Sequence, residues 1–286
     1  MEHHSNIIPW QMICKRTGSK INYLKSKEDG TLDLNEYKKA LNNKVKIVSI
    51  THASNVFGTI NPVEEMIDLA SNKEIKVLVD ACQSAPHIKI DVKKMNCDFL
   101  AFSGHKMFGP TGVGVLYGKS ELLEEMDPYQ TGGGIIETVT MEESTWTHSP
   151  YKFEPGSPMA AQAIALSDAA DYLDNCLAND TSNIEEYSKE KMSSINGINI
   201  YGNAKHRTPI ISFNIEGVHS LDLAHFLDYE GITIRSGHHC CQPLMNALNI
   251  SSCARASFYF YNSKKDVDFL VNKINKAIKI LKYWKI

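Results

Sequence analysis

Short apolar runs alternate with amphipathic segments through the first half of the chain. The runs at 46–52, 77–80 and 99–102 have the length and composition of strands buried on both faces of a sheet. Segments 33–41 and 62–72 repeat apolar residues at helical spacing. This alternation of strand and helix is typical of βαβ units, and it predicts an α/β domain with a mainly parallel sheet.

The second half of the chain has a different pattern, typical of an α+β unit. Its expected elements are an alanine-rich helix at 159–177, a strand at 210–215, a helix at 220–229, a strand at 232–235 and a closing helix at 267–281. The long helix is suited to bridge two units. We therefore expect a large domain over residues 1–172 and a smaller C-terminal domain over residues 173–286.

Local signals add finer expectations in the first domain. Residues 21–24 are typical of a short strand, and Asp29-Gly30 is typical of a turn. Asp33 is placed to cap the helix at 33–41. The glycine-rich segment 109–117 predicts a tight turn back into a further strand.

Composition narrows the classes of partner and compartment. With 43% hydrophobic and 22% charged residues among 286, the chain has the composition of a soluble globular protein. A formal charge of −3 argues against nucleic-acid and membrane partners. Seven cysteines without a Cys-x-x-Cys pair argue against a disulfide framework. No signal peptide or spanning apolar run is evident, so a cytoplasmic location is expected, with an organellar one left open.

An acid and a lysine follow two neighbouring apolar runs. Asp80 closes the run at 77–80, and Lys106 follows the run at 99–102. Each has an ordinary structural explanation, as a turn former or as a solvated side chain. Together they match pyridoxal 5'-phosphate chemistry, which needs a lysine amine, a carboxylate for the pyridine nitrogen and small phosphate donors such as Ser103 and His105.

The residues around this pair resemble a known family. Val-Asp-Ala-Cys-Gln-Ser at 79–84 and Phe-Ser-Gly-His-Lys-Met-Phe-Gly-Pro-Thr-Gly at 102–112 are similar to class V aminotransferases. Within that family they resemble the group II cysteine desulfurases (SufS-like) and selenocysteine lyases. The resemblance implies the fold type I architecture of pyridoxal phosphate enzymes, with a cofactor-binding large domain, helices on both faces of its sheet, and a small domain.

The resemblance also implies roles for residues outside the two motifs. His3 corresponds to a histidine that stacks on the cofactor ring, although a histidine so near the first residue is also typical of a solvated terminus. Gln83 would bond the phenolic oxygen of the cofactor. Asn55 would contact the substrate carboxylate and the cofactor, although Asn in such a turn is often structural. Ser157 stands where a threonine usually reaches the cofactor phosphate of a second chain, which implies a homodimer.

A second motif carries a thiol. Arg235-Ser-Gly-His-His-Cys240-Cys241 resembles the group II desulfurase signature, in which the first cysteine accepts sulfur. Adjacent residues rarely coordinate one metal with good geometry, so we expect no zinc site. Neighbouring His and Arg charges favour a thiolate at Cys240, whereas Cys241 is the better candidate for a buried, inert thiol. Arg255 matches the arginine that holds the substrate carboxylate, and Arg235 joins it in the expected substrate site.

The resemblance predicts a cysteine desulfurase. L-Cysteine, or L-selenocysteine, would be converted to L-alanine, with Lys106 moving the α-proton and a persulfide left on Cys240. The sulfur would pass to an acceptor protein for iron–sulfur cluster assembly. Another class V activity, such as transamination, is disfavoured because it does not require the thiol motif.

Two departures from the family pattern leave a different class of function open. The family's opening segment, with its phosphate-binding turn, has no counterpart, so the chain is expected to be N-terminally truncated. The stretch 187–201 also leaves little room for the helix that the family places before a strand. The alternative function is therefore a non-catalytic or incomplete fragment that pairs with a full-length desulfurase or a sulfur acceptor.

Overall fold

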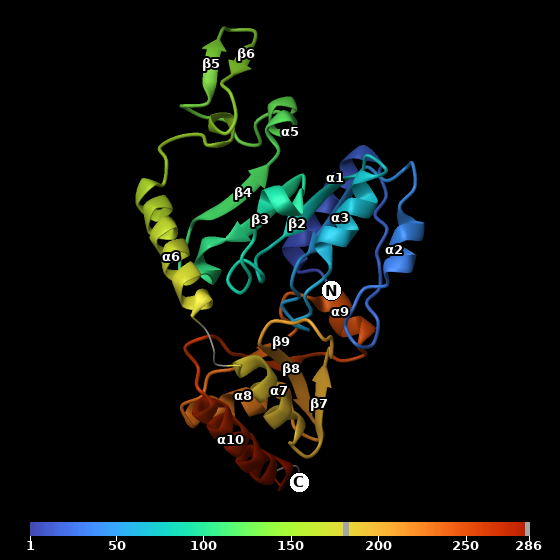
Figure 1. Cartoon of the computed structure of the whole chain (residues 1–286), viewed down its shortest axis with the longest axis vertical. Coiled ribbons are helices and arrows are strands. Elements are labelled where there is room, and N and C mark those ends of the chain that lie inside the picture. The colour runs from blue at the N-terminus through green and yellow to red at the C-terminus, as the bar shows by residue number, and fades with distance from the viewer. Residues whose placement is uncertain (180–182, 284–286) are drawn as a thin grey trace.

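A four-stranded, mainly parallel sheet forms the centre of the first half of the molecule (Figure 1). The computed structural model describes residues 1–179 and 183–283. In sheet order the strands are β1 (Ile47–Thr51), β2 (Lys76–Asp80), β3 (Phe99–Ser103) and β4 (Gly114–Gly118). The first three are parallel, and β4 runs antiparallel to β3. The predicted strands at 46–52, 77–80 and 99–102 and the predicted return strand are confirmed.

Helices connect and cover these strands. In chain order they are the 3-10 turn η1 (His4–Asn6), α1 (Ile8–Thr17), α2 (Leu34–Ala40), α3 (Val63–Ser71), α4 (Val92–Met95), the 3-10 turn η2 (Gly104–Lys106) and α5 (Ser120–Glu125). Helix α3 packs against β2. Met66 and Ile67 from the helix and Val77 and Val79 from the strand are all buried in one core. Their burial removes apolar surface from water and stabilises the βαβ arrangement.

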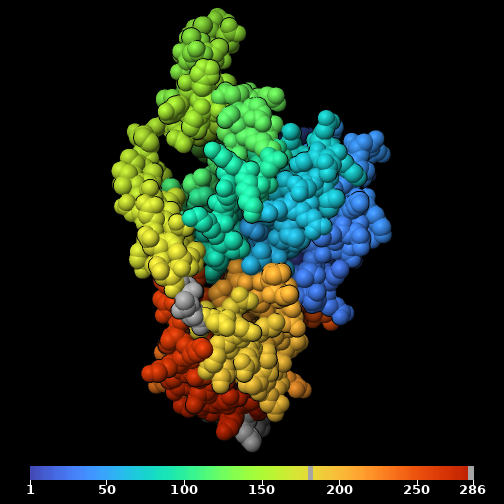
Figure 2. All heavy atoms as spheres, in the orientation of Figure 1, coloured from blue at the N-terminus to red at the C-terminus, as the bar shows by residue number. Residues whose placement is uncertain are grey.

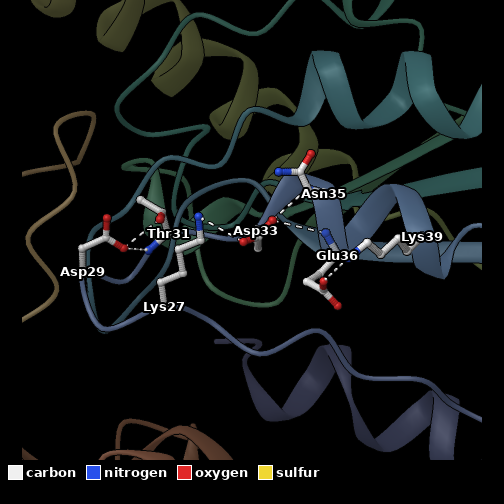
Figure 3. Close-up of polar contacts among 7 residues, drawn as sticks. All are labelled: Lys27, Asp29, Thr31, Asp33, Asn35, Glu36 and Lys39. Atoms are coloured by element: carbon white, nitrogen blue, oxygen red, sulfur yellow. Dashed lines mark hydrogen bonds and ion pairs between the residues drawn. The ribbon is translucent and has the colours of Figure 1, made fainter.

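The start of α2 shows how local sequence fixes an element (Figure 3). One carboxylate oxygen of Asp33 accepts the backbone N–H of Asn35 at 2.8 Å and of Glu36 at 3.2 Å. These bonds satisfy donors that a helix leaves unpaired in its first turn. They also lower the pKa of Asp33, with Lys27 at 3.3 Å contributing in the same direction. The predicted cap is confirmed.

The second half folds around an antiparallel sheet of order β7-β8-β10-β9. Its strands are β7 (Ile198–Tyr201), β8 (Ile210–Ile215), β9 (Arg235–Gly237) and β10 (Cys253–Ser257). Its helices are α7 (Ile184–Ser193), α8 (Ser220–Tyr229), α9 (Gln242–Ala247) and α10 (Lys264–Tyr283). The buried core includes Phe213 from β8, Leu223 from α8 and Ile274 from α10. The predicted α+β texture is confirmed.

Helix α6 (Ala160–Ala178) runs from the first sheet toward the second half, as Figure 1 shows. It confirms the predicted helix at 159–177. The proposed boundary between residues 172 and 173 lies inside this continuous helix, and the division into two domains stays a prediction. Within the described residues, none of the helices is both long enough and apolar enough to cross a membrane.

A hairpin extends from the body of the molecule (Figures 1 and 2). It consists of β5 (Ile136–Val139) and β6 (Ser144–Trp146), and the 3-10 turn η3 (Tyr151–Phe153) follows it. Val139 and Met141 are exposed on this arm. The apolar pattern of the sequence did not predict the hairpin, because its strands have no buried face to impose an alternation.

The structure differs from the sequence expectations at three places. No strand forms at 21–24, because the backbone there finds no partner; the nearby pairing is an isolated bridge between Ser26 and Leu32. The strand expected at 232–235 begins at Arg235, the first residue that pairs with β10. The stretch 187–201 holds most of α7 and all of β7, so the expectation that it leaves little room for a helix is wrong.

The segment that follows β1 joins the two halves. Phe57 is buried in a core that also contains Tyr201 and Met245 from the second half. The Ser212 hydroxyl donates to the Val56 carbonyl at 2.6 Å. A Cβ on Gly202 would come within 2.7 Å of the Phe57 side chain, so glycine is what permits this close approach. The two sheets are therefore fixed relative to each other by direct packing.

Candidate functional site

Polar side chains collect where the parallel strands end. Thr51 pairs with Asp80, and Asp80 pairs with Ala101, so the carboxyl ends of β1, β2 and β3 are aligned. Asp80 is 7% exposed, and its Oδ1 accepts the backbone N–H of Cys82 at 2.9 Å. Among residues 1–179 and 183–283, no cationic side chain forms an ion pair with it. The Asp80 carboxylate is thus buried at the carboxyl end of the parallel strands, and no described cationic side chain forms an ion pair with it.

Lys106 and His3 lie near this carboxylate. Lys106 ends the turn η2, directly after β3. Partial burial lowers the pKa of His3; the positive charge of Lys106 lowers it further, whereas the negative charge of Asp80 raises it. The His3 Nδ1 accepts the backbone N–H of Ser5 at 3.2 Å, which orients the ring. His3 is therefore near enough to Asp80 and Lys106 to respond to both charges.

Glu2 is a half-buried residue with a fixed carboxylate, which the sequence did not indicate. It accepts the backbone N–H of Thr51 at 3.0 Å and the side-chain amide of Asn6 at 2.7 Å. Burial raises the pKa of Glu2, and these two hydrogen bonds oppose that rise. The interactions fasten the segment that carries His3 to the end of β1. A glutamate in a polar run gave no signal of this burial.

The other residues expected to bind the cofactor are more exposed than Asp80 or make fewer contacts. The Ser103 hydroxyl lies 3.6 Å from the Cys82 sulfur, beside the Asp80 strand end. Gln83 is half-buried and His105 is exposed. Ser157 is exposed in the segment between η3 and α6. Among the described residues no hydrogen bond joins Ser157 to Ser103, His105 or Lys106, so its proposed role in a second chain's site stays a prediction.

The thiol loop lies against the first residues of the chain. The Cys240 carbonyl accepts the backbone N–H of His4 at 2.8 Å. The sulfur of Cys240 lies 3.9 Å from an Arg235 nitrogen. His239 and Cys240 both have positive φ, 52° and 54°, a conformation that costs energy for residues with a Cβ. The loop is thus held in an unusual conformation next to the His3 segment.

Cys240 and Cys241 occupy opposite environments. Cys240 is half-buried, whereas Cys241 is 1% exposed. The Cys241 thiol donates to the Glu2 carbonyl at 3.2 Å. Burial raises the pKa of Cys241 to about 11, so its thiol stays protonated near neutral pH. This environment agrees with the expectation of an inert thiol at Cys241.

Two arginines face each other across adjacent strands. Arg235 of β9 pairs directly with Arg255 of β10, an arrangement in which like charges repel. Burial lowers the pKa of Arg255, and the charge of Arg235 adds to that effect. Arg255 donates to the Asn55 carbonyl at 3.0 Å, while its buried Nε has no partner among the described residues. The pair forms a site that an anion would stabilise.

Asn55 and His239 connect the thiol loop to both sheets. The Asn55 amide donates to the His239 carbonyl at 2.8 Å. The His239 Nε2 lies 3.0 Å from the Cys253 carbonyl, and burial lowers the pKa of His239 to about 4. His239 is therefore neutral at physiological pH and acts as a structural contact. The amide nitrogen of Asn55 is engaged by backbone, and its proposed contact with substrate stays a prediction.

Comparison with known proteins now identifies the family. The family model described as Aminotransferase class-V matches residues 1–270. The chain belongs to the class V aminotransferase family. A probable cysteine desulfurase of Halalkalibacterium halodurans is 49% identical over 97% of this chain and 69% of its own length. One of Staphylococcus aureus is 46% identical over 99% of this chain and 70% of its own length.

Solved structures give the same class V architecture. The apo cysteine desulfurase of Thermococcus onnurineus superposes with a TM-score of 0.92 at 36% identity, covering 97% of this chain and 71% of that chain. The cysteine desulfurase CsdA (S-sulfonic acid) of Escherichia coli also gives 0.92, at 34% identity over 98% of this chain and 71% of that chain. These likenesses confirm the predicted fold type I architecture with its mainly parallel sheet.

The chemistry of this class V site fits pyridoxal phosphate, which the family uses. The buried Asp80 carboxylate, with no cationic partner among the described residues, suits a protonated ring nitrogen. Lys106 offers an amine at the same carboxyl end of the sheet, directly after β3. By contrast, no group of His, Cys, Asp or Glu side chains within the described part of the chain could hold a metal ion.

Proposed function

We propose that this chain is a pyridoxal phosphate-dependent cysteine desulfurase that converts L-cysteine to L-alanine and leaves the sulfur on Cys240 as a persulfide. One observation carries the proposal. The 2.8 Å hydrogen bond from His4 to the Cys240 carbonyl fastens the thiol loop to the segment of His3, whose pKa responds to Lys106 and Asp80. This bond, with the response of the His3 pKa to both charges, supports a single site that contains the thiol, the amine and the carboxylate.

The proposed cofactor site uses residues from the ends of β2 and β3. Lys106 would hold pyridoxal phosphate covalently, and Asp80 would keep its ring nitrogen protonated, so that the bound ring supplies an electron sink. His3 would cover the ring, and Gln83 would bond its phenolic oxygen. Ser103 and His105 would bind the phosphate, together with Ser157 from a second copy of the chain.

The two arginines provide the proposed substrate contact. Arg255 has an unpartnered, buried Nε among the described residues, and Arg235 faces it across the strand pair. A carboxylate between them would relieve the repulsion and accept paired N–H bonds. Asn55 lies against Arg255 and would complete the site. In this proposal the bound amino acid would point its side chain toward Cys240, whose sulfur lies 3.9 Å from an Arg235 nitrogen.

Two side chains would carry out the bond changes. The Lys106 amine would take the proton from the substrate α-carbon and return a proton at the end of the reaction. The Cys240 thiolate would attack the substrate sulfur, so that an S–S bond forms as the C–S bond breaks. The carbon keeps the electron pair of the broken bond and gains a proton, which gives alanine. Relatives that carry the name probable cysteine desulfurase support this reaction.

The finer parts of the proposal concern partners. We infer that the persulfide sulfur passes to an acceptor protein for iron–sulfur cluster assembly, as expected for a SufS-like enzyme in the cytoplasm. A homodimer follows if Ser157 serves a neighbouring site. Selenocysteine could react by the same route, because its selenium would occupy the position of the sulfur that Cys240 attacks.

The experiment combines a spectrum with a product assay. Purified chain is mixed with pyridoxal phosphate, and the visible spectrum is compared with that of Lys106→Ala. We expect a lysine-dependent absorbance band and release of alanine from L-cysteine. Cys240→Ala should abolish alanine release, whereas Cys241→Ala should retain it. The reverse result for the two cysteines would falsify the assignment.

A second candidate function rests on exposed apolar surface. Among the described residues β4 lies at the sheet edge, with Val115 39% and Leu116 55% exposed. Ile164 of α6 is 65% exposed, and Figure 2 shows an opening between α6 and the body of the molecule. Such surface favours a non-catalytic subunit that pairs with a desulfurase or a sulfur acceptor. A chain that gives no absorbance band but co-purifies with such a partner would support this alternative.

A further inference from the structure

The loop that carries Cys240 leads directly into helix α9. Gln242 is the first residue of that helix, and Pro243 is the second. The first N–H groups of a helix have no partner within it, and proline has no N–H to satisfy. The Gln242 N–H is therefore the donor at this helix start that needs an acceptor from elsewhere in the molecule.

The imidazole of His4 supplies that acceptor. The Gln242 N–H donates to the His4 Nε2 at 3.0 Å, although the two residues are far apart in the sequence. A ring nitrogen that accepts a hydrogen bond carries no proton, so this bond requires an unprotonated Nε2 on His4. The His4 ring thus caps α9 from the opposite half of the molecule.

This cap acts on a loop with backbone strain. His239 and Cys240 hold left-handed φ values of 52° and 54°, which a non-glycine residue keeps only when its surroundings impose them. One side of the loop is fixed by the bond from Asn55 to the His239 carbonyl. The other side is fixed at Gln242 by His4, and Cys240 lies between these two points.

We propose that His4 is a positioning residue for the Cys240 thiol, acting by capping helix α9 through its Nε2. This role deepens the proposed function, and it rests on Cys240 being the sulfur acceptor of that function. His4 does not touch the thiol itself in this assignment. It keeps the strained loop closed, and with it the 3.9 Å approach of the Cys240 sulfur to Arg235.

Three substitutions distinguish the effect of the hydrogen-bond acceptor on His4 from the effect of the volume of its ring. His4→Phe keeps a ring and removes the acceptor, His4→Ala removes both, and His4→Gln keeps an acceptor of similar reach. The backbone bond from residue 4 to the Cys240 carbonyl remains in all of them. His219→Ala is a matched control, because His219 caps α8 through a ring nitrogen that accepts the Leu221 N–H at 3.3 Å.

The first measurement is hydrogen exchange of the Gln242 amide in the 286-residue chain. His4→Phe and His4→Ala should speed this exchange roughly fivefold to tenfold, because the amide loses its acceptor. His4→Gln should restore most of the protection. His219→Ala should leave the Gln242 amide unchanged.

The second measurement is the rate of Cys240 alkylation by iodoacetamide in a Cys241→Ala background. An opened loop exposes the half-buried thiol, so His4→Phe should react roughly threefold to tenfold faster than its parent. Unchanged exchange and alkylation in both His4→Phe and His4→Ala would overturn the proposal, as would failure of His4→Gln to rescue. Wild-type chain that releases no alanine while these results hold would refute the proposed function and leave the role of His4 intact.

Discussion

The two sheets bring their functional side chains to the site in different ways. In the parallel sheet, the register of the strands places Asp80 and the turn of Lys106 at the same carboxyl end of the sheet. In the antiparallel half, Cys240 occupies a loop of left-handed residues that contacts from Asn55 and His4 hold in place. The first arrangement follows from sheet geometry, whereas the second depends on contacts between distant parts of the chain.

The largest expected effect on activity comes from a substitution of Asp80, at the carboxyl end of the parallel strands. Asp80→Asn removes the buried charge proposed to stabilise the cofactor ring, and we expect alanine release to fall about a hundredfold to a thousandfold. Asp98→Asn is the matched control, because Asp98 is also buried in this region but accepts the Val77 N–H and pairs with Lys119. It should reduce stability while the folded protein keeps its activity. Equal loss of activity in both variants would contradict a specific role of Asp80 in the proposed cofactor site.

The next effect tests how the two halves are joined. Phe57 is 1% exposed in the core shared by both units. Phe57→Ala should cost about 3–5 kcal/mol of stability and separate the unfolding of the two halves into distinct calorimetric transitions. Phe213→Ala removes a ring from the core of the second half alone. If it separates the transitions as strongly as Phe57→Ala does, Phe57 has no special joining role.

The same comparison explains what the sequence could predict. The strands that carry Asp80 and precede Lys106 are continuous apolar runs, and a strand end is visible in such a run. The cap at Asp33 and the helix at 220–229 are likewise local signals, and both are confirmed. Elements whose sequence signal lies within a short stretch of neighbouring residues are therefore predicted well.

Nonlocal contacts account for the features that were missed. The Glu2 carboxylate accepts the Thr51 N–H, and the His4 ring caps α9, yet neither partner is near in sequence. Residues 232–235 have an apolar alternation, but Ile232 and Ile234 pack against the core without joining the ladder that starts at Arg235. Alternation reports which side chains are buried; it does not report where a strand partner begins.

A smaller effect tests the anion site formed in the antiparallel sheet. Arg255→Lys keeps the charge and loses the planar fork, so the KM for L-cysteine should rise about tenfold with a smaller change in kcat. Arg16→Lys, at an exposed position of α1, is the control for the same substitution. Steady-state kinetics measure the KM for L-cysteine of both variants, and Arg16→Lys should leave it unchanged. An unchanged KM for Arg255→Lys would mean that the substrate carboxylate binds elsewhere.

The smallest effect returns to a purely local feature of the parallel half. Asp33→Ala removes the cap of α2 and should lower the Tm by about 2 °C at pH 7, whereas Asp33→Asn retains a capping oxygen and should change it less. Hydrogen bonds from Glu36 and Asn35 hold the pKa of Asp33 below its usual value of 3.8, so its charge stabilises the fold above that pH. The Tm difference between wild type and Asp33→Ala should shrink as the pH falls below 3.8 and the folded carboxylate gains its proton. Melting curves between pH 7 and pH 3 measure this difference, and a difference that grows on acidification would show that the cap does not act through its charge.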